Sequence, residues 1–207
     1  MAKLSAAEEQ ARFIAMSAYE KELWQQGINY IAGLDEAGRG PLAGPVTAAA
    51  VILPQDCLIP GLNDSKKLSE KKRLALEKEI KEQALAWSCV NINHQIIDKI
   101  NILEASRLAM AKAVQKLAVA PQHLLIDAVS LDVAIPQTAI IHGDALSISI
   151  AAASIIAKNT RDRLMVLMDA KWPQYGFAAH KGYPTAAHKQ ALRQYGYCPI
   201  HRRSFKY

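Results

Sequence analysis

The sequence predicts an α/β protein in which helices flank a mixed five-stranded sheet, with a small helical region at the carboxyl end. Three observations lead to this class. Short apolar runs, typical of buried strands, alternate along the chain with longer amphipathic segments. The first two runs follow each other so closely that they favour antiparallel pairing. The later runs are separated by helical segments, so the sheet is expected to be mixed.

Size and composition fit a single domain. The chain has 207 residues, of which 51% are hydrophobic, and this is enough for a full core. We expect a core region over about residues 28–170 and a basic carboxyl-terminal region over about residues 171–207. No run of about 18 apolar residues appears, so no membrane span is expected.

The first residues and the cysteines favour the cytoplasm. Met1–Arg12 contains four charged residues, which is unlike the apolar region of a secretory leader. The three cysteines, Cys57, Cys89 and Cys198, are scattered and odd in number, without a disulfide framework or metal-ligand spacing. A reducing compartment suits them.

The amino-terminal half has a signal for each of its elements. Gly27 stops the first helix, whose alanines and glutamates are good helix formers. Two apolar runs follow as strands, and Pro54 ends the second of them. Ser69 is a good N-cap for the next helix. The expected elements are helix 5–25, strands 28–35 and 44–53, helix 70–84 and strand 87–92.

In the carboxyl-terminal half, the longest helix has the clearest pattern. Ile148, Ala152 and Ile155 recur at helical spacing and should face the core, and Pro173 ends the helix. The two strands before it are short apolar runs. The expected elements are helix 95–118 with a break near Asn101, strands 123–127 and 138–141, and helices 147–170 and 185–195.

Four acidic residues each follow an apolar run: Asp35 and Glu36 after the first strand, Asp127 after the fourth and Asp144 after the fifth. Ligands of open α/β sheets bind at the carboxyl ends of strands. Carboxylates gathered there cannot all ionise without cations, and their oxygens suit Mg²⁺ or Mn²⁺. Two such ions about 3.5–4 Å apart can activate water and stabilise the leaving oxygen of a phosphodiester. We expect all four acids to be catalytic metal ligands, with Asp35 bridging two ions.

Simpler interpretations stay open for each acid. Asp127 could cap a strand, and Asp144 could cap the long helix. Asp35 and Glu36 cannot both point to one face of a regular strand, so Glu36 is expected beyond the regular part if both bind metal. Asp162 is interpreted as an ion-pair partner of neighbouring arginines. Zinc ligand spacing and the Gly-x-Ser-x-Gly elbow of a triad hydrolase are both absent from the sequence.

Positive charge is concentrated near the carboxyl end. The net charge is +6, and residues 171–207 hold seven basic residues and no acidic one. Aromatic residues are interleaved with these charges, which favours nucleic acid as the partner over a solvated basic helix. The candidate phosphate contacts are Lys66, Lys67, Lys181, Arg202 and Arg203.

Two loops have the composition of a sugar-binding site. In the Gly38-Arg39-Gly40 loop, the glycines let backbone groups approach a ribose, and Arg39 can hold the adjacent phosphate. Contact with the 2′-hydroxyl is what distinguishes RNA from DNA. Tyr183 lies in a rigid turn that would present its ring outward. The simpler alternatives are a tight turn with an exposed arginine and a tyrosine packed on the core.

Five sequence strings lie in one order across nearly the whole chain: DEAGRG from Asp35, DSKKL from Asp64, GDA from Gly143, HKGYPT from His180 and HRRSF from His201. Together they resemble bacterial ribonuclease HII. The resemblance implies a ribonuclease H-like fold and an endonuclease that hydrolyses the RNA strand of RNA/DNA hybrids. It also implies cleavage on the 5′ side of single ribonucleotides in duplex DNA, leaving 3′-hydroxyl and 5′-phosphate ends.

The resemblance extends to individual residues. It maps the four catalytic acids of the family onto Asp35, Glu36, Asp127 and Asp144, with Mn²⁺ or Mg²⁺ as cofactor. It implies that the Gly38-Arg39-Gly40 loop contacts the ribonucleotide and that Tyr183 packs on the sugar that follows. Lys66 and Lys181 are expected to contact substrate, and the protein to act as a monomer in ribonucleotide and primer removal.

Other interpretations of the family and the function remain open. The related ribonuclease HIII family normally has an extra amino-terminal domain and a different glycine-rich loop. The Gly-Tyr-Pro-Thr string departs from the Gly-Tyr-Gly-Thr of some relatives, although the tyrosine is kept. A non-catalytic hybrid-binding module would tolerate neutralisation of the acids. Another nuclease or integrase-like member of the fold would show no preference for ribonucleotides.

Overall fold

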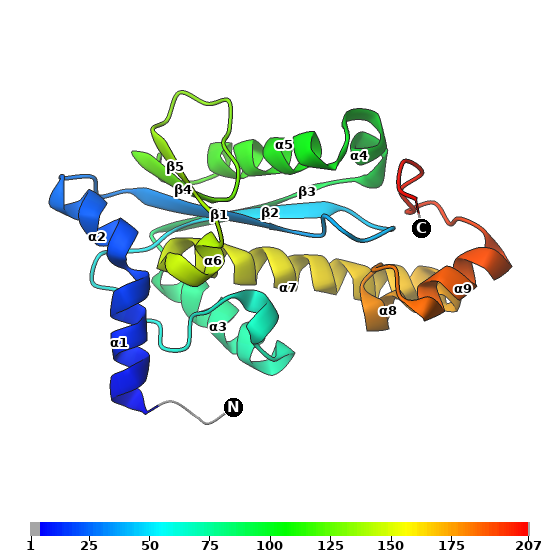
Figure 1. Cartoon of the computed structure of the whole chain (residues 1–207), viewed down its shortest axis with the longest axis horizontal. Coiled ribbons are helices and arrows are strands. Elements are labelled where there is room, and N and C mark those ends of the chain that lie inside the picture. The colour runs from blue at the N-terminus through cyan, green and yellow to red at the C-terminus, as the bar shows by residue number, and fades with distance from the viewer. Residues whose placement is uncertain (1–4, 207) are drawn as a thin grey trace.

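The computed structural model describes residues 5–206; residues 1–4, part of the leader prediction, and Tyr207 lie outside this range. The strands are β1 Ile31–Ala37, β2 Val46–Ile52, β3 Ala86–Ile92, β4 His123–Asp127 and β5 Gln137–Ile140. They form one sheet in the order β3-β2-β1-β4-β5 (Figure 1). Pairing is antiparallel among β1, β2 and β3 and parallel among β1, β4 and β5. The predicted α/β class with a mixed five-stranded sheet is confirmed.

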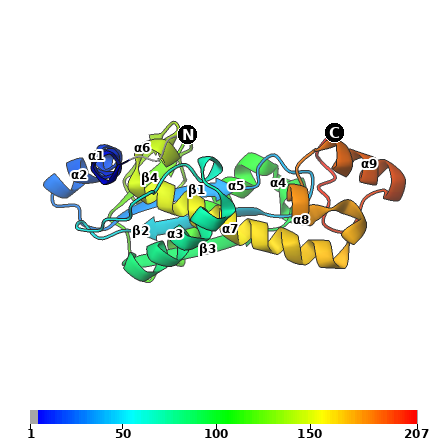
Figure 2. The same cartoon turned by 90° about the horizontal axis from the view of Figure 1, so that it is seen from below.

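The helices are α1 Ala6–Met16, α2 Ala18–Gln25, α3 Glu70–Gln83, α4 His94–Ile100, α5 Ile102–Gln115, α6 Gly143–Leu146, α7 Ile148–Lys171, α8 Phe177–His180 and α9 Ala186–Tyr195, with 3-10 turns at Ser65–Lys67 and Pro173–Tyr175. Helices α4 and α5 cover one face of the sheet, and α3 and α7 cover the other (Figure 1, Figure 2). The pair α1 and α2 stands at one end, and α8 and α9 at the other. Among the helices of residues 5–206, none has the length and apolar character needed to cross a membrane.

Two predicted boundaries differ from the structure for physical reasons. The predicted helix 5–25 is two helices, because the Ser17 hydroxyl donates to the carbonyl oxygen of Phe13 at 2.7 Å and closes the first one. Strand β1 runs past its predicted end, because β2 keeps pairing with it as far as Ala37 and Thr47.

Other local predictions are confirmed. Ser69 is the N-cap of α3, and its hydroxyl accepts a hydrogen bond from the N–H of Lys72. The long helical segment breaks at Asn101, whose backbone has a φ of 67° and whose side chain caps α5. The short helices α6 and α8 were not predicted.

Helix α7 lies very close to β1, and Gly33 makes this approach possible. A Cβ atom at Gly33 would lie 2.1 Å from the backbone carbonyl carbon of Ser149. The predicted stripe of Ile148, Ala152 and Ile155 is buried in this layer. The longest helix is therefore held directly against the central strand.

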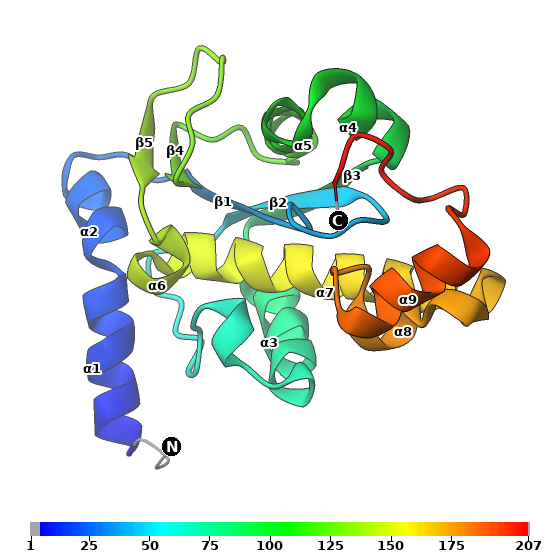
Figure 3. The same cartoon turned by 45° about the vertical axis from the view of Figure 1, so that its right-hand side comes forward.

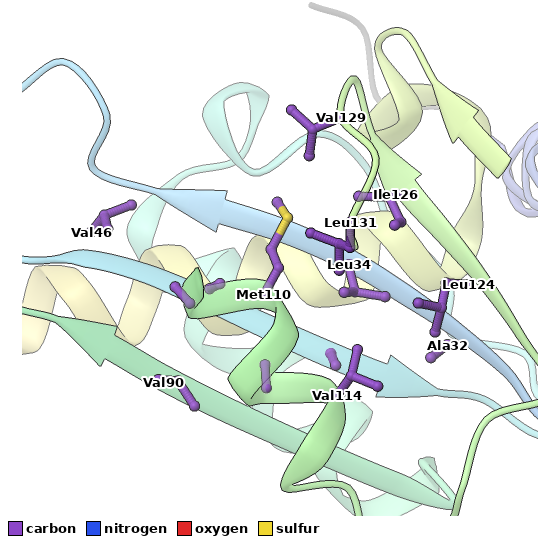
Figure 4. Packing of buried hydrophobic residues seen from close by; sticks show 14 of the residues in the cluster. Ala32, Leu34, Val46, Val90, Met110, Val114, Leu124, Ile126, Val129 and Leu131 are labelled. Atoms are coloured by element: carbon purple, nitrogen blue, oxygen red, sulfur yellow. The ribbon is translucent and has the colours of Figure 1, made fainter. Parts of the chain in front are cut away.

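A second core fills the space between the sheet and α5. Met110 and Val114 of α5 pack with Leu34 and Ile126 of the central strands (Figure 4). The sheet is thus covered on both faces, and every residue of β2 is buried. Burial on both faces explains why the strands appear in the sequence as continuous apolar runs.

Glu20 has a structural role that the sequence did not predict. Its side chain is buried between α2 and the start of α7, where Oε1 accepts hydrogen bonds from the Ser147 hydroxyl at 2.5 Å and the Ser149 N–H at 3.0 Å. Burial raises the pKa of Glu20. This acid on an otherwise apolar face joins the amino-terminal helix pair to the long helix.

Candidate active site

The carboxyl ends of β1 and β4 bring Asp35 and Asp127 together. The two strands are parallel, and their last paired residues are Leu34 and Ile126. Asp35 and Asp127 follow these residues directly, so they lie side by side at one edge of the sheet. The expected convergence of strand ends is present for this pair.

Asp144 reaches the same place through the short helix α6. The N–H of Gly143 donates to Oδ1 of Asp127 at 2.8 Å, which anchors the first turn of α6 to the end of β4. Asp144 is the next residue and is buried. The long helix has a different cap, because the Ser147 hydroxyl accepts the N–H of Ile150. The simpler interpretation of Asp144 as the cap of that helix is therefore wrong.

Glu36 lies inside the regular strand, and the expectation that it lies beyond it is wrong. It pairs with Ala48 of β2. Pairing with β4 stops at Leu34, so β1 overhangs β4 from Asp35 onward. Beyond Leu34 the residues of β1 are no longer flanked by paired residues of β4, and both Asp35 and Glu36 line the adjoining cleft. Alternation of the side chains therefore does not keep Glu36 away from the cleft that Asp35 also lines.

The four carboxylates act on one another electrostatically. Burial raises the pKa of Asp35 well above its usual value, and the charges of the other three carboxylates raise it further. Burial raises the pKa of Glu36 too, although the nearby Arg39 guanidinium opposes this. For Asp144, burial is again the largest cause of a raised pKa. The acids from β1, β4 and α6 therefore form one cluster.

Protein cations balance this cluster only weakly. Arg39 Nη1 lies 3.5 Å from Glu36 Oε1, and Lys66 Nζ lies 3.8 Å from Asp144 Oδ2. The Arg39 side chain is 45% exposed and that of Lys66 78% exposed, so water screens both pairs. Oε2 of Glu36 is buried and has no hydrogen-bond partner among residues 5–206. These cations offset little of the charge that the cluster carries when it is ionised, so a further cation is needed to neutralise it.

The donor set fits a hard divalent cation. Carboxylate oxygens are the preferred ligands of Mg²⁺ and Mn²⁺, and the unpartnered Glu36 oxygen is available as a donor. In the described part of the chain, no three Asp, Glu, His or Cys side chains already stand in coordinating positions. An ion would therefore have to draw these carboxylates together.

The backbone is strained beside two of the acids. Ala128, which follows Asp127, has a φ of 55°, and His142, two residues before Asp144, has a φ of 58°. Residues with a side chain rarely adopt this left-handed conformation, and such strain is concentrated at functional sites.

A fifth carboxylate near the cluster was missed. After burial, the charge of Asp64 is the next largest cause of the raised pKa of Asp144. Asp64 caps a 3-10 turn by accepting the N–H of Lys66 at 2.9 Å. The DSKKL string was the available signal, but Asp64 precedes a helical turn and does not follow a strand.

A cleft of about 580 Å³ opens beside Asp35 and Glu36. It brings together most of the residues that the sequence predicted for substrate. Asp127 and Asp144 are not part of its lining, but Lys66 lines it and reaches Asp144. The predicted site residues that line the cleft are Asp35, Glu36, Gly38, Arg39, Gly40, Lys66, Lys181 and Tyr183.

Tyr183 and the glycine loop face each other across the cleft. A Cβ atom at Gly40 would lie 3.7 Å from the Tyr183 ring, and the tyrosine is 41% exposed. Tyr183 is therefore not a buried core residue. Lys181, at the start of the same turn, has its ammonium group hydrogen-bonded to the carbonyl oxygen of Ala178.

The other basic candidates have different positions. Arg202 is fully buried, so its prediction as a phosphate contact is wrong. Arg203 is exposed and lies over the Tyr197 ring at 4.3 Å, and Lys67 lies 3.9 Å from Asp64. Neither lines the cleft.

Asp162 is an ion-pair residue, as interpreted from the sequence. Its carboxylate lies 2.7 Å from Lys158 Nζ and 3.5 Å from Arg73 Nη2. A larger hollow of about 740 Å³ lies elsewhere, beside α5. Of its two acids, Glu104 is paired with Arg107, and Asp132 is exposed, so the hollow offers no comparable cluster.

A model of the ribonuclease HII family matches residues 32–207 of the chain. The chain belongs to the ribonuclease HII family. Ribonucleases HII are endonucleases that act on RNA/DNA hybrids, so the predicted enzyme class is confirmed. Helices α1 and α2, including Glu20, precede the matched residues.

Individual relatives agree with this family. The ribonuclease HII of Bacillus cytotoxicus is 56% identical over 198 residues, which are 96% of this chain and 76% of that protein. The ribonuclease H2 structure from Pyrococcus horikoshii has a TM-score of 0.72 at 28% identity, covering 85% of this chain and 93% of the other. Bst-RNase HIII in complex with Mn²⁺ shares the fold, with a TM-score of 0.64 at 19% identity over 84% and 65% of the two chains.

Proposed function

We propose that this ribonuclease HII hydrolyses the RNA strand of RNA/DNA hybrids and the bond on the 5′ side of single ribonucleotides in duplex DNA. The products would carry 3′-hydroxyl and 5′-phosphate ends. The observation that supports this most strongly is one cleft lined by Asp35 and Glu36 of the four-carboxylate cluster, by the Gly-Arg-Gly loop and by an exposed tyrosine.

Asp35, Glu36, Asp127 and Asp144 would hold Mn²⁺ or Mg²⁺, two ions in the proposed site. When bound, such ions activate water and stabilise the leaving oxygen of a phosphodiester. The buried, unpartnered Glu36 oxygen and the weak balance from protein cations support this assignment. The Mn²⁺ complex of the distantly similar Bst-RNase HIII is consistent with it.

The remaining groups would bind and orient the substrate. Arg39 would hold a phosphate, and the backbone at Gly38 and Gly40 would approach the ribose, where a 2′-hydroxyl is the group to recognise. Tyr183, opposite Gly40, would pack on the following sugar and favour DNA on the 3′ side. Lys66 and Lys181 would lie along the phosphate backbone, with binding that weakens steeply as salt rises.

The proposal extends to the setting of the reaction. The protein would act as a monomer in the cytoplasm, with about residues 28–170 as the catalytic core and 171–207 helping to bind substrate. Its partners would be RNA/DNA hybrids and DNA containing ribonucleotides, in ribonucleotide and primer removal. Light scattering of the purified protein tests the monomer.

One assay tests the function directly. A DNA duplex that carries a single ribonucleotide is incubated with the enzyme in Mg²⁺, in Mn²⁺ or in chelator, beside an all-DNA duplex of the same sequence. We expect one cut, 5′ to the ribonucleotide, only with metal and only in the first duplex. Cutting of both duplexes would indicate a different nuclease of this fold. Binding without any cut would indicate a non-catalytic hybrid-binding protein.

A further inference from the structure

Two arginines are fully buried without an acidic partner. Arg161 and Arg202 are 1% and 0% exposed, and no carboxylate among residues 5–206 lies within ion-pair distance of either guanidinium. Burial lowers the pKa of Arg161 to about 10 and that of Arg202 to about 9. Burying unpaired cations is unfavourable, and apolar residues of similar size would serve stability at least as well. Their placement therefore calls for another explanation.

All three guanidinium nitrogens of Arg202 bind backbone carbonyl groups, two of them in the glycine loop and two in the segment that follows it. Nη2 donates to the carbonyl oxygens of Gly38 at 2.6 Å and Pro45 at 3.1 Å. Nη1 donates to that of Arg39 and Nε to that of Gly44, both at 3.0 Å. Its planar fork can hold several carbonyl groups at fixed angles, which a lysine ammonium does not do.

Arg161 extends the same contacts to the turn that carries Tyr183. Nη2 donates to the carbonyl oxygen of Ala43 at 3.1 Å, Nε to that of Pro45 at 3.0 Å, and Nη1 to that of Lys181 at 3.0 Å. A Cβ atom at Gly38 would lie 2.1 Å from Arg161 Nε. Gly38 therefore has to be a glycine for this arginine to pack beneath the loop.

The carbonyl contacts fix the direction of two N–H donors. In a trans peptide the C=O and the following N–H point in opposite directions, and no peptide bond in the described residues is cis. Since Arg202 holds the carbonyls of Gly38 and Arg39, the N–H groups of Arg39 and Gly40 point away from it. Both residues line the cleft, and neither N–H donates a hydrogen bond to another of residues 5–206.

We propose that Arg202, supported by Arg161, sets the preference of the enzyme for ribonucleotides by aiming the N–H groups of Arg39 and Gly40 at the 2′-hydroxyl. The two arginines act as positioning residues, because they lie beneath the loop and never touch substrate. This inference rests on the function proposed above. An N–H group can also bind a phosphate oxygen, so the test must separate sugar recognition from phosphate binding.

The test compares affinities for two duplexes that differ by one oxygen. Dissociation constants are measured, with Ca²⁺ replacing the catalytic ion, for a DNA duplex with a single ribonucleotide and for the all-DNA duplex. The variants are Arg202→Lys and Arg161→Lys, with Arg107→Lys as the control on the opposite face of the sheet. Thermal unfolding of each variant shows whether it is folded.

The preference is the dissociation constant for the all-DNA duplex divided by that for the duplex with a ribonucleotide. We expect Arg202→Lys to lower this ratio by about 10-fold, the effect of one well-placed hydrogen bond, while the affinity for the all-DNA duplex stays nearly unchanged. Arg161→Lys should have a smaller effect, because Arg202 still holds the Gly38 and Arg39 carbonyls. Equal weakening of binding to both duplexes would show that the N–H groups bind a phosphate and would overturn the proposal.

Three further outcomes are decisive. An unchanged ratio in a folded Arg202→Lys protein, or unfolding of both lysine variants, would leave the arginines with a purely structural role and also overturn the proposal. A wild-type enzyme that does not distinguish the duplexes would instead refute the proposed function itself.

Discussion

Two regions of the molecule bury charge in opposite ways. At the ends of β1 and β4, carboxylates lie close together, the cations paired with them are exposed, and one oxygen of Glu36 has no partner among residues 5–206. Beneath the glycine loop, two guanidiniums are buried, and all their nitrogens donate to backbone carbonyls. The first region needs a ligand from outside, whereas the second is satisfied within the chain. In the proposed function, the first region is the reactive centre and the second is the framework that orients the loop beside it.

Removing one charge from the acidic region should have the largest effect. We expect Asp35→Asn to lower the cleavage rate by about 10³-fold or more, because a catalytic metal supplies several kcal/mol of transition-state stabilisation. Hybrid binding should persist. Mn²⁺ should raise the melting temperature of the wild type and not of the variant. Retained turnover, or loss of activity in the surface control Asp132→Asn as well, would contradict the metal-ligand assignment.

The close packing of β1, which carries Asp35, against α7, which carries Arg161, should be the next most sensitive feature. In Gly33→Ala the new methyl group would overlap the backbone of Ser149, so we expect a loss of about 3 kcal/mol in unfolding free energy. Urea unfolding measures this. Gly27→Ala is the matched control: its φ is 82° but its Cβ would meet no atom within 4 Å, so strain alone should cost about 1 kcal/mol. Equal losses would refute the close approach.

Acidification should change the folding stability in opposite directions through the two regions. Burial lowers the pKa of His201 to about 4, and its two ring nitrogens already contact His188 and the N–H of Cys198. The unfolded chain then binds more protons between pH 6.5 and 4, so this histidine removes about 2 kcal/mol of stability from pH 7 to pH 5. For Asp35 the raised pKa acts oppositely, since its contribution is present in acid and lost as pH rises.

The contribution of His201 is measured by comparing how the unfolding free energy changes with pH in the wild type and in a variant. Unfolding free energies of the wild type and His201→Gln are measured by urea titration at pH 7 and pH 5. The variant should lose clearly less stability on acidification than the wild type does. Identical slopes would show that His201 does not titrate in this range.

The smallest expected effect concerns the junction preference. Tyr183→Ala should reduce the ratio of cleavage rates on an RNA–DNA junction and a uniform hybrid by about 10-fold, if stacking on the sugar or base contributes about 1–2 kcal/mol. Tyr30→Ala is a matched control, because Tyr30 is 42% exposed and Tyr183 is 41% exposed. If the Tyr183 variant keeps the full preference for the junction, the tyrosine has no role in substrate recognition.

The sequence was informative wherever a role follows from a local pattern. The convergence of Asp35, Asp127 and Asp144 was predictable because each follows an apolar run, and strand ends meet at one edge of a parallel sheet. Glu36 was misplaced because its surroundings depend on where β4 stops pairing, which no local pattern reveals.

Roles that depend on distant contacts were missed. Glu20 meets Ser147 across 127 positions, and Arg202 meets Gly38 across 164. In the sequence Glu20 weakens a helical pattern, and Arg202 is one more basic residue in a basic segment. Only packing shows that the first joins two helices and that the second lies beneath a loop.

The return of the carboxyl-terminal segment to the sheet (Figure 3) has a consequence for synthesis on the ribosome. The carbonyl of Leu42 accepts the N–H of Arg202, and the N–H of Gly44 donates to Ile200. A nascent chain can pair its strands and gather its carboxylates while the glycine loop still lacks these anchors. A polypeptide released before Arg202 would retain the acidic residues but not the support that shapes the loop beside them.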